Sequence, residues 1–237
     1  MKIIEEDREF EEYIMNGGGC IAVPLEVTER GGEYTVTVYS RFRDVAEEFS
    51  DTFEGDAFSE KAESFLRLKL AEPMKEAGYE YSEMNSSTVV RFLAEKKKLS
   101  AVPEVDGEIV MITSNEQFEK YFNNATRDIE LDDDDEDDVC FAIVKDECIL
   151  SFAGVNDITD DGCLDINVET SVEARGKSYA AAVVISLANY LLDRGEQVCY
   201  RCRSTNAPSI RVAEKSGFIR DSLTYSFVCY DFDADEA

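Results

Sequence analysis

The sequence predicts a mixed α/β fold, in which strands of both directions share a sheet with helices, rather than a doubly wound parallel sheet. Short segments alternate apolar and polar residues with a period of two, as at Tyr34, Val36 and Val38. Two long segments, residues 59–77 and 178–192, instead repeat their apolar residues at helical spacing. The second half reads β-α-β-β-β-α-β-α-β, and residues 139–144 and 149–155 are expected to form an antiparallel pair around Lys145-Asp146-Glu147.

The first half predicts five elements in order. They are a helix at residues 6–15, strands at 20–28 and 33–41, a helix at 59–77 and a strand at 87–93. Gly31-Gly32 forms the turn between the two strands, as in a hairpin. Pro73 should kink the second helix or end it early, because proline lacks the amide hydrogen that a helix interior needs.

Residues 96–107 contain charges, Pro103 and Gly107 but no periodicity, which predicts a domain boundary. We therefore expect a smaller N-terminal α/β domain over residues 1–104 and a second domain over residues 105–237. The elements expected in the second are strands at 109–113, 139–144, 149–155, 163–170, 197–203 and 218–232, and helices at 116–123, 178–192 and 208–215. The acidic run at 130–138 should be a solvated loop.

The net charge is −28, with 52 acidic against 24 basic residues. Nucleic acids and anionic membranes bind through lysine and arginine, so this field argues against both as partners. It attracts cations, which include amines and basic peptides. The alternative is that the charge only maintains solubility.

Histidine is absent, which excludes histidine bases, histidine-containing triads and histidine-liganded metals. The seven cysteines lack the spacing of a disulfide framework, and Cys199 and Cys202 have no second pair to complete a zinc site. We therefore expect no metal. No apolar run is long enough to cross a membrane or to form a signal peptide, so we expect reduced thiols in a cytoplasmic protein.

The first informative motif, residues 173–180, joins a predicted strand to the long helix. A turn of small residues that opens a helix directs free amides and the positive end of the helix dipole at one point, which suits a phosphate or diphosphate. An ordinary helix start is the alternative. A nucleotide P-loop is excluded, because Ser171 stands where that motif needs a glycine five residues before Gly176.

The second motif, residues 205–218, surrounds the next helix. Asn206 or Thr205 caps the helix, Pro208 lies in its first turn and Gly217 ends it. Each of these residues has a structural explanation by itself.

Together the two motifs resemble the GNAT superfamily of acyl-CoA-dependent N-acyltransferases over roughly residues 108–232. The family's diphosphate loop reads R/Q-x-x-G-x-G/A, which Arg175 and Ala180 match, while Ser178 stands where glycine is usual. Its second segment reads N-x-x-S or N-x-x-A and ends in Gly-Phe, as do Asn206, Ser209 and Gly217-Phe218 here. The resemblance implies a GNAT-like fold in the C-terminal half and an opening between the strands 163–170 and 197–203.

The resemblance further implies that acetyl-CoA is the cosubstrate and that a primary amine of a small molecule accepts the acetyl group by direct transfer. The cofactor-binding residues that it implies are Thr170, Val172, Arg175, Gly176, Lys177, Ser178, Tyr179, Ala180, Asn206 and Ser209. For the general base we choose Glu169 first and Asp165 second. These carboxylates alternate with apolar residues and so share one face of their strand. A solvated polar face is the alternative.

Many GNAT relatives have a tyrosine seven residues after the asparagine, placed to protonate the thiolate, and here that position is Ala213. Another hydroxyl such as Tyr225 or Tyr230 could serve, water could protonate the thiolate, or activity could be weak. Ala213 and Ser178 therefore also fit a catalytically silent module that senses CoA or contacts proteins. The N-terminal region could cover the acceptor site, mediate homodimerisation or be a decayed second acyltransferase-like unit.

Overall fold

The computed structural model describes residues 1–6, 13–15, 19–76, 83–123, 131 and 139–232. The chain divides into two compact units. Unit 1 comprises Met1–Val90, Arg203–Thr205 and Ser222–Ala237, and unit 2 comprises Arg91–Cys202 and Asn206–Asp221. Strands β5 (Glu83–Leu93), β11 (Val198–Arg203) and β12 (Ile219–Phe232) each have residues in both units. Among the described residues, no helix is both long and apolar enough to cross a membrane.

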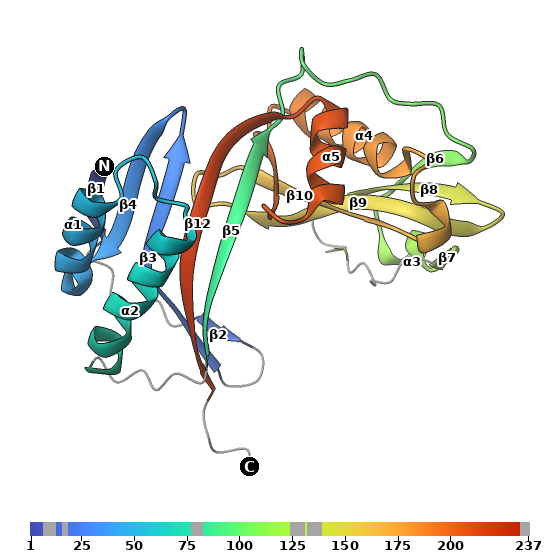
Figure 1. Ribbon diagram of the computed structural model, residues 1–237. Coiled ribbons are helices and arrows are strands. Elements are labelled where there is room, and N and C mark those ends of the chain that lie inside the picture. The colour runs from blue at the N-terminus through green and yellow to red at the C-terminus, as the bar shows by residue number, and fades with distance from the viewer. Residues whose placement is uncertain (7–12, 16–18, 77–82, 124–130, 132–138, 233–237) are drawn as a thin grey trace. The chain divides into compact units, whose positions relative to one another are not determined.

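Unit 1 is a sheet with two α-helices packed on it (Figure 1). Its elements are β1 (Lys2–Glu6), β2 (Tyr13–Met15), β3 (Gly19–Arg30), β4 (Glu33–Tyr39), the short 3₁₀ helix η1 (Ser40–Phe42), α1 (Arg43–Thr52), α2 (Glu60–Glu76), β5 (Glu83–Leu93) and β12 (Ile219–Phe232). The strand order is β1-β4-β3-β12-β5, and β2 pairs with β3. The core lies between sheet and helices, where Leu25, Val36, Phe49 and Leu66 are fully buried.

Most elements of unit 1 agree with the sequence-based expectations, but one prediction is wrong. Residues 2–6 and 13–15 are strands, whereas a helix was expected over 6–15; residues 7–12 lie outside the described residues. Pairing with β4 and β3 explains the difference, because tertiary partners override a weak helical period. Helix α2 also continues past Pro73 to Glu76, and α1 was not predicted.

Unit 2 contains the elements that lie between β5 and β12 along the chain. They are β6 (Glu108–Ile112), α3 (Asn115–Phe118), β7 (Phe122–Asn123), β8 (Cys140–Lys145), β9 (Cys148–Ile158), β10 (Leu164–Thr170), the 3₁₀ helix η2 (Val172–Ala174), α4 (Tyr179–Asp193), β11 (Val198–Arg203) and α5 (Ala207–Ser216). The strand order is β5-β11-β10-β9-β8-β6. Because β10 and β11 are parallel while β8, β9 and β10 are antiparallel, the sheet is mixed, which confirms the predicted fold class.

Helix α4 is the central helix of unit 2 and lies against β8, β9 and β10, beside α5 (Figure 1). Nine of its residues are buried, among them Val183, Ile185 and Leu187. This burial accounts for a helix that is apolar on nearly every side. The predicted acidic loop at 130–138 lies outside the described residues except for Leu131, which is buried in the core beside β8 and β9.

The segment expected to form a domain boundary packs onto unit 2. The amide of Ser100 donates to the carbonyl of Ser216 at 3.0 Å, and the Tyr179 hydroxyl donates to the carbonyl of Asp106 at 2.8 Å. The compact units divide after Val90 and do not coincide with the boundary expected after residue 104. The division into one domain over residues 1–104 and a second over residues 105–237 stays a prediction.

Candidate active site

The site begins where β10 and β11 separate. Their parallel register holds for two pairs, Leu164 with Val198 and Asp165 with Cys199. On its other side, β10 stays paired with β9 as far as Thr170. Among the described residues, β10 has no pairing with β11 beyond Asp165, so main-chain groups further along this edge, such as those of Val168, are available to a ligand.

The loop between β10 and α4 contains two residues in the left-handed backbone conformation. Gly176 has φ 77° and Ser178 has φ 64°. Ser178 is the N-cap of α4, but its hydroxyl does not cap the helix. Amides in the first turn of a helix have no intrahelical partner, so those of Tyr179 to Ala181 remain available for an anion. The serine therefore adopts the conformation that the usual glycine of this motif permits.

Helix α5 begins on the other side of the opening. The carboxamide oxygen of Asn206 accepts the amide of Ser209 at 3.2 Å, and Pro208 lies in the first turn. Gly217 ends the helix with φ 86°, and its amide donates to the carbonyls of Ala213 and Glu214. The cap, the proline and the terminal glycine thus have the structural roles that the sequence predicted.

A cavity of about 640 Å³ joins these three elements. It is lined by nine of the residues that were expected to form the site: Glu169, Thr170, Arg175, Gly176, Ser178, Tyr179, Ala180, Asn206 and Ser209. Val172 and Lys177 do not line it, and Val172 is 65% exposed. The structure thus brings together two motifs that a helix and a strand separate in the chain.

Basic residues line this cavity although the chain is strongly acidic. Arg175 contributes from the loop, and Arg211 and Lys215 contribute from one face of α5. Within the part of the chain that the structure describes, none of the three forms an ion pair, and Arg175 donates its Nε hydrogen to the Thr170 carbonyl at 3.3 Å. Three cations without carboxylate partners beside a helix N-terminus suit a ligand that carries several negative charges.

Three polar lining residues, Tyr200, Arg211 and Lys215, were not predicted from the sequence. Tyr200 is 3% exposed. Burial raises the pKa of Tyr200, and a hydrogen bond with the Ser209 side chain partly opposes that rise, so its hydroxyl keeps its proton at neutral pH. Helical spacing from Pro208 identifies Arg211 and Lys215 as one face of α5, whereas no local pattern identifies Tyr200.

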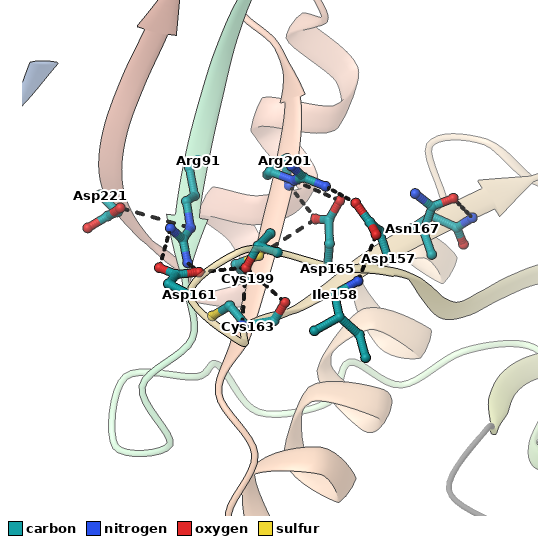
Figure 2. A network of polar contacts seen from close by, with 12 residues as sticks. Arg91, Asp157, Ile158, Asp161, Cys163, Asp165, Asn167, Cys199, Arg201 and Asp221 are labelled. Carbon is teal, nitrogen blue, oxygen red and sulfur yellow. Dashed lines mark hydrogen bonds and ion pairs between the residues drawn. The ribbon is translucent and has the colours of Figure 1, made fainter. Parts of the chain in front are cut away.

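Asp165 is not placed as expected for a general base. It does not line the cavity, and its carboxylate accepts both the main-chain amide and the Nε hydrogen of Arg201 at 3.0 Å. Figure 2 shows this carboxylate directed at Arg201, which also reaches Asp157. Burial raises the pKa of Asp165, and Arg201 opposes the rise. Of the two carboxylates considered for the base, Glu169 alone lines the cavity.

Of the two tyrosines considered as proton donors, Tyr225 does not line this cavity. Tyr225 belongs to unit 1, where it is 5% exposed, and burial raises its pKa to about 12. The side chain of Tyr230 lies outside the described residues. Ala213, at the position of the usual GNAT tyrosine, is fully buried and does not line the cavity.

The fold and the cavity define an α/β protein in which the edge of β10, the N-terminus of α4 and a basic face of α5 line one cavity. A sequence model of the acetyltransferase (GNAT) domain matches residues 67–219. The chain therefore belongs to the GNAT acetyltransferase family, and the resemblance inferred from the two motifs is confirmed. The match begins within α2, well before the range over which those motifs carried the resemblance. No significant match to a curated protein was found.

This chain is also similar to several solved structures. A Drosophila protein is 9% identical, with a TM-score of 0.51 over 71% of this chain and 58% of that one. A GCN5-related N-acetyltransferase-like protein from Streptococcus suis is 15% identical, with a TM-score of 0.47 over 88% of both chains. A GNAT-family putative acetyltransferase from Novosphingobium aromaticivorans is 18% identical, with a TM-score of 0.45 over 64% of this chain and 67% of that one.

Proposed function

We propose that this protein is an N-acetyltransferase that moves an acetyl group from acetyl-CoA directly to a primary amine of a small, cationic substrate. The observation that supports the proposal most is the cavity, in which the start of α4, the basic face of α5 and the open edge of β10 meet. A diphosphate and an extended amide-containing arm are the two chemical features of acetyl-CoA that match these elements.

In this proposal the start of α4 and Arg175 hold the diphosphate. The amides of Gly176 to Ala180 and the guanidinium donate to phosphate oxygens, which are stronger acceptors than neutral groups. Main-chain groups at Thr170, together with Asn206 and Ser209, bond the amides of the pantetheine arm. Except for Lys177, these residues line the cavity. Val172 and Lys177, which do not, contribute at most from its edge.

Amine acylation requires removal of a proton from the amine, stabilisation of the oxyanion and protonation of the leaving thiolate. Acetyl-CoA supplies the acetyl group as a thioester. Glu169 accepts the proton of the amine, directly or through one water. An open amide of β10 stabilises the oxyanion. Tyr200 donates its hydroxyl proton to the sulfur as the carbon–sulfur bond breaks, and solvent then restores that proton.

The acceptor class follows from the charge of the chain. A net charge of −28 raises the local concentration of cations, so a polyamine or a similar basic amine would associate faster than a neutral amine. Salt screens such attraction over about 10 Å at 0.1 M ionic strength. The rate with such an amine should therefore fall as ionic strength increases, whereas the rate with a neutral amine should not.

The test is turnover measured by mass spectrometry, because the protein's own thiols would react with a thiol-sensitive dye. The full chain is incubated with acetyl-CoA and a panel of polyamines, amino sugars and amino acids. We expect an acetylated amine, and we expect Glu169→Gln to lower kcat by about 10²-fold or more without changing the affinity for acetyl-CoA. Glu173→Gln, an exposed residue of η2, is the matched control and should behave like the wild type.

The second candidate is a catalytically silent member of the family that senses CoA or contacts another protein. It is favoured by Ala213 and Ser178, which depart from the family pattern. Saturable binding of acetyl-CoA without turnover across the panel would support this candidate and contradict the first. Turnover of any amine would exclude it.

A further inference from the structure

The carboxylate of Asp165 occupies a position in the sheet where a carbonyl would be expected. The Leu164 amide donates to the Gln197 carbonyl at 2.8 Å, as in a regular parallel ladder. Two residues further along, a regular ladder would pair the Arg201 amide with the Ile166 carbonyl. Instead this amide donates to Asp165 Oδ1 at 3.0 Å. A side chain thus replaces the main-chain acceptor at the point where the strands part.

The guanidinium of Arg201 holds this carboxylate in place. Its Nε donates to Asp165 Oδ2 at 3.0 Å, and its Nη2 donates to Asp157 Oδ2 of β9 at 2.8 Å (Figure 2). Asp165 is 6% exposed, so solvent competes little for its oxygens. The Arg201 amide donates to one carboxylate oxygen of Asp165, and the Arg201 Nε donates to the other. Together these bonds fix the rotamer of Asp165 and the distance between β10 and β11.

The open groups of β10 lie on the same side as this replacement. The Leu164 amide points to β11 and the Ser171 amide points to β9, where it donates to the Leu150 carbonyl at 2.9 Å. Alternation along a strand therefore directs the main-chain groups of Ile166, Val168 and Thr170 away from β9 and toward the opening. Val168 and Thr170 line the cavity.

We propose that Asp165 is a positioning residue that ends the β10–β11 ladder and keeps the β10 edge open for the arm of acyl-CoA. The proposal rests on the function proposed above only for the identity of the ligand. The pairing of β10 with β9 also shifts register between Asp165 and Ile166, so the sheet is irregular at the same place where the Arg201 amide lacks its usual carbonyl acceptor. Asp165 satisfies it, and so the strands do not close over the site.

The test is hydrogen exchange of single amides by NMR in the ligand-free full chain. In the wild type, the Val168 amide should exchange at least about 100-fold faster than the Leu164 amide, because only the latter is bonded across the ladder. In Asp165→Val the Arg201 amide loses its acceptor, so the ladder extends. The Val168 amide should then slow by about 10-fold or more, and the Kd for acetyl-CoA should increase by about 10-fold or more. Asp165→Asn keeps an acceptor oxygen and should stay within about 3-fold of the wild type in both measurements.

Asp161→Asn is the matched control. Asp161 pairs with Arg91 in the same network and does not line the cavity, so neither measurement should change (Figure 2). A wild-type Val168 amide that is as protected as that of Leu164 overturns the proposal, whether or not the valine variant folds. A folded Asp165→Val variant with wild-type exchange and affinity also overturns it. If the wild type fails to bind acetyl-CoA, the proposed function fails, and the exchange comparison still decides the role of Asp165.

Discussion

A β-carbon placed on Gly217 would lie 2.2 Å from the carbonyl oxygen of Lys98. The last residue of the α5 cap thus contacts the segment that connects β5 with β6. This approach is possible only without a side chain, and the φ of 86° at Gly217 also favours glycine. The segment is therefore part of the unit that contains the cavity, and its backbone supports the end of the helix that carries Arg211 and Lys215.

Gly217→Ala should destabilise the protein by about 3 kcal/mol, because strain at positive φ adds to steric overlap with backbone. Gly195→Ala is the matched control: Gly195 has φ 90° but no atom within 4 Å of the added carbon. It should cost about 1 kcal/mol. Urea unfolding of both variants measures the difference. An equal loss of stability in the two variants would show that the backbone at Lys98 moves aside at no cost in free energy.

Ser178→Gly should stabilise the protein by up to about 1 kcal/mol. Left-handed backbone costs a residue with a side chain about 1–2 kcal/mol, and the greater freedom of glycine in the unfolded chain offsets part of the gain. Affinity for acetyl-CoA should stay equal or increase. Ser186→Gly, within α4, should instead destabilise. Thermal unfolding compares the two, and a less stable Ser178→Gly variant would mean that the hydroxyl makes an essential contact.

Asn206 has two separable roles. Asn206→Ala removes the acceptor for the Ser209 amide and should cost about 1 kcal/mol of stability as well as weakening acetyl-CoA binding. Asn206→Ser preserves a capping oxygen but not the carboxamide, so stability should be nearly retained while affinity falls. Denaturation and calorimetry on the same samples separate these effects. If Asn206→Ser binds acetyl-CoA with wild-type affinity, the Asn206 carboxamide does not contribute to binding.

The Arg91–Asp161 pair predicts an acid-dependent contribution to stability. The Arg91 guanidinium, which donates to both oxygens at 2.7 and 3.0 Å, lowers the pKa of Asp161 from 3.8 to about 2. A lowered folded-state pKa means that the stabilisation is fully present above about pH 4 and is lost as the pH falls toward 2. Half of the Asp161 side chain is exposed, so solvent screening limits the contribution to about 1 kcal/mol.

The measurement for this pair is urea unfolding between pH 2 and 7. Asp161→Asn should be less stable than the wild type at neutral pH, and the difference should vanish toward pH 2. Asp160→Asn, an exposed neighbour that forms no ion pair among the described residues, should follow the wild-type curve. If Asp161→Asn is less stable than the wild type by the same amount at every pH, the acid-dependent contribution does not come from the Arg91–Asp161 pair.

Local signals in the sequence predicted much of unit 2. The asparagine cap at Asn206, the terminal Gly217 and the period-two strands each depend on neighbours along the chain, so their positions could be inferred. The partner of Asp165 could not be inferred, because Arg201 contacts it from the neighbouring strand. The sequence does not distinguish a carboxylate that is paired in this way from one that is free on a strand face. Tyr200 was missed for a similar reason, since its contact with Ser209 arises only when β11 and α5 come together.

Tertiary pairing also explains the wrong prediction in unit 1. Tyr13 and Ile14 have helical spacing with Phe10, yet residues 13–15 pair antiparallel with β3. Residues 96–107 lack periodicity, which is typical of a linker. Within unit 2, hydrogen bonds of Ser100 and Asp106 give this segment a fixed place. Composition alone does not distinguish a packed irregular segment from a flexible one.

The central claim is that the cavity between the start of α4 and α5 binds acetyl-CoA, and calorimetric titration of the full chain tests it most directly. The claim predicts saturable binding at one site per chain. Arg211→Ala combined with Lys215→Ala should weaken this binding about 10-fold or more, because both cations line the cavity and neither forms an ion pair among the described residues. Lys61→Ala, on the exposed surface of α2, should leave the affinity unchanged. Absence of saturable heat at millimolar acetyl-CoA, or equal affinity in the double variant, would contradict the claim.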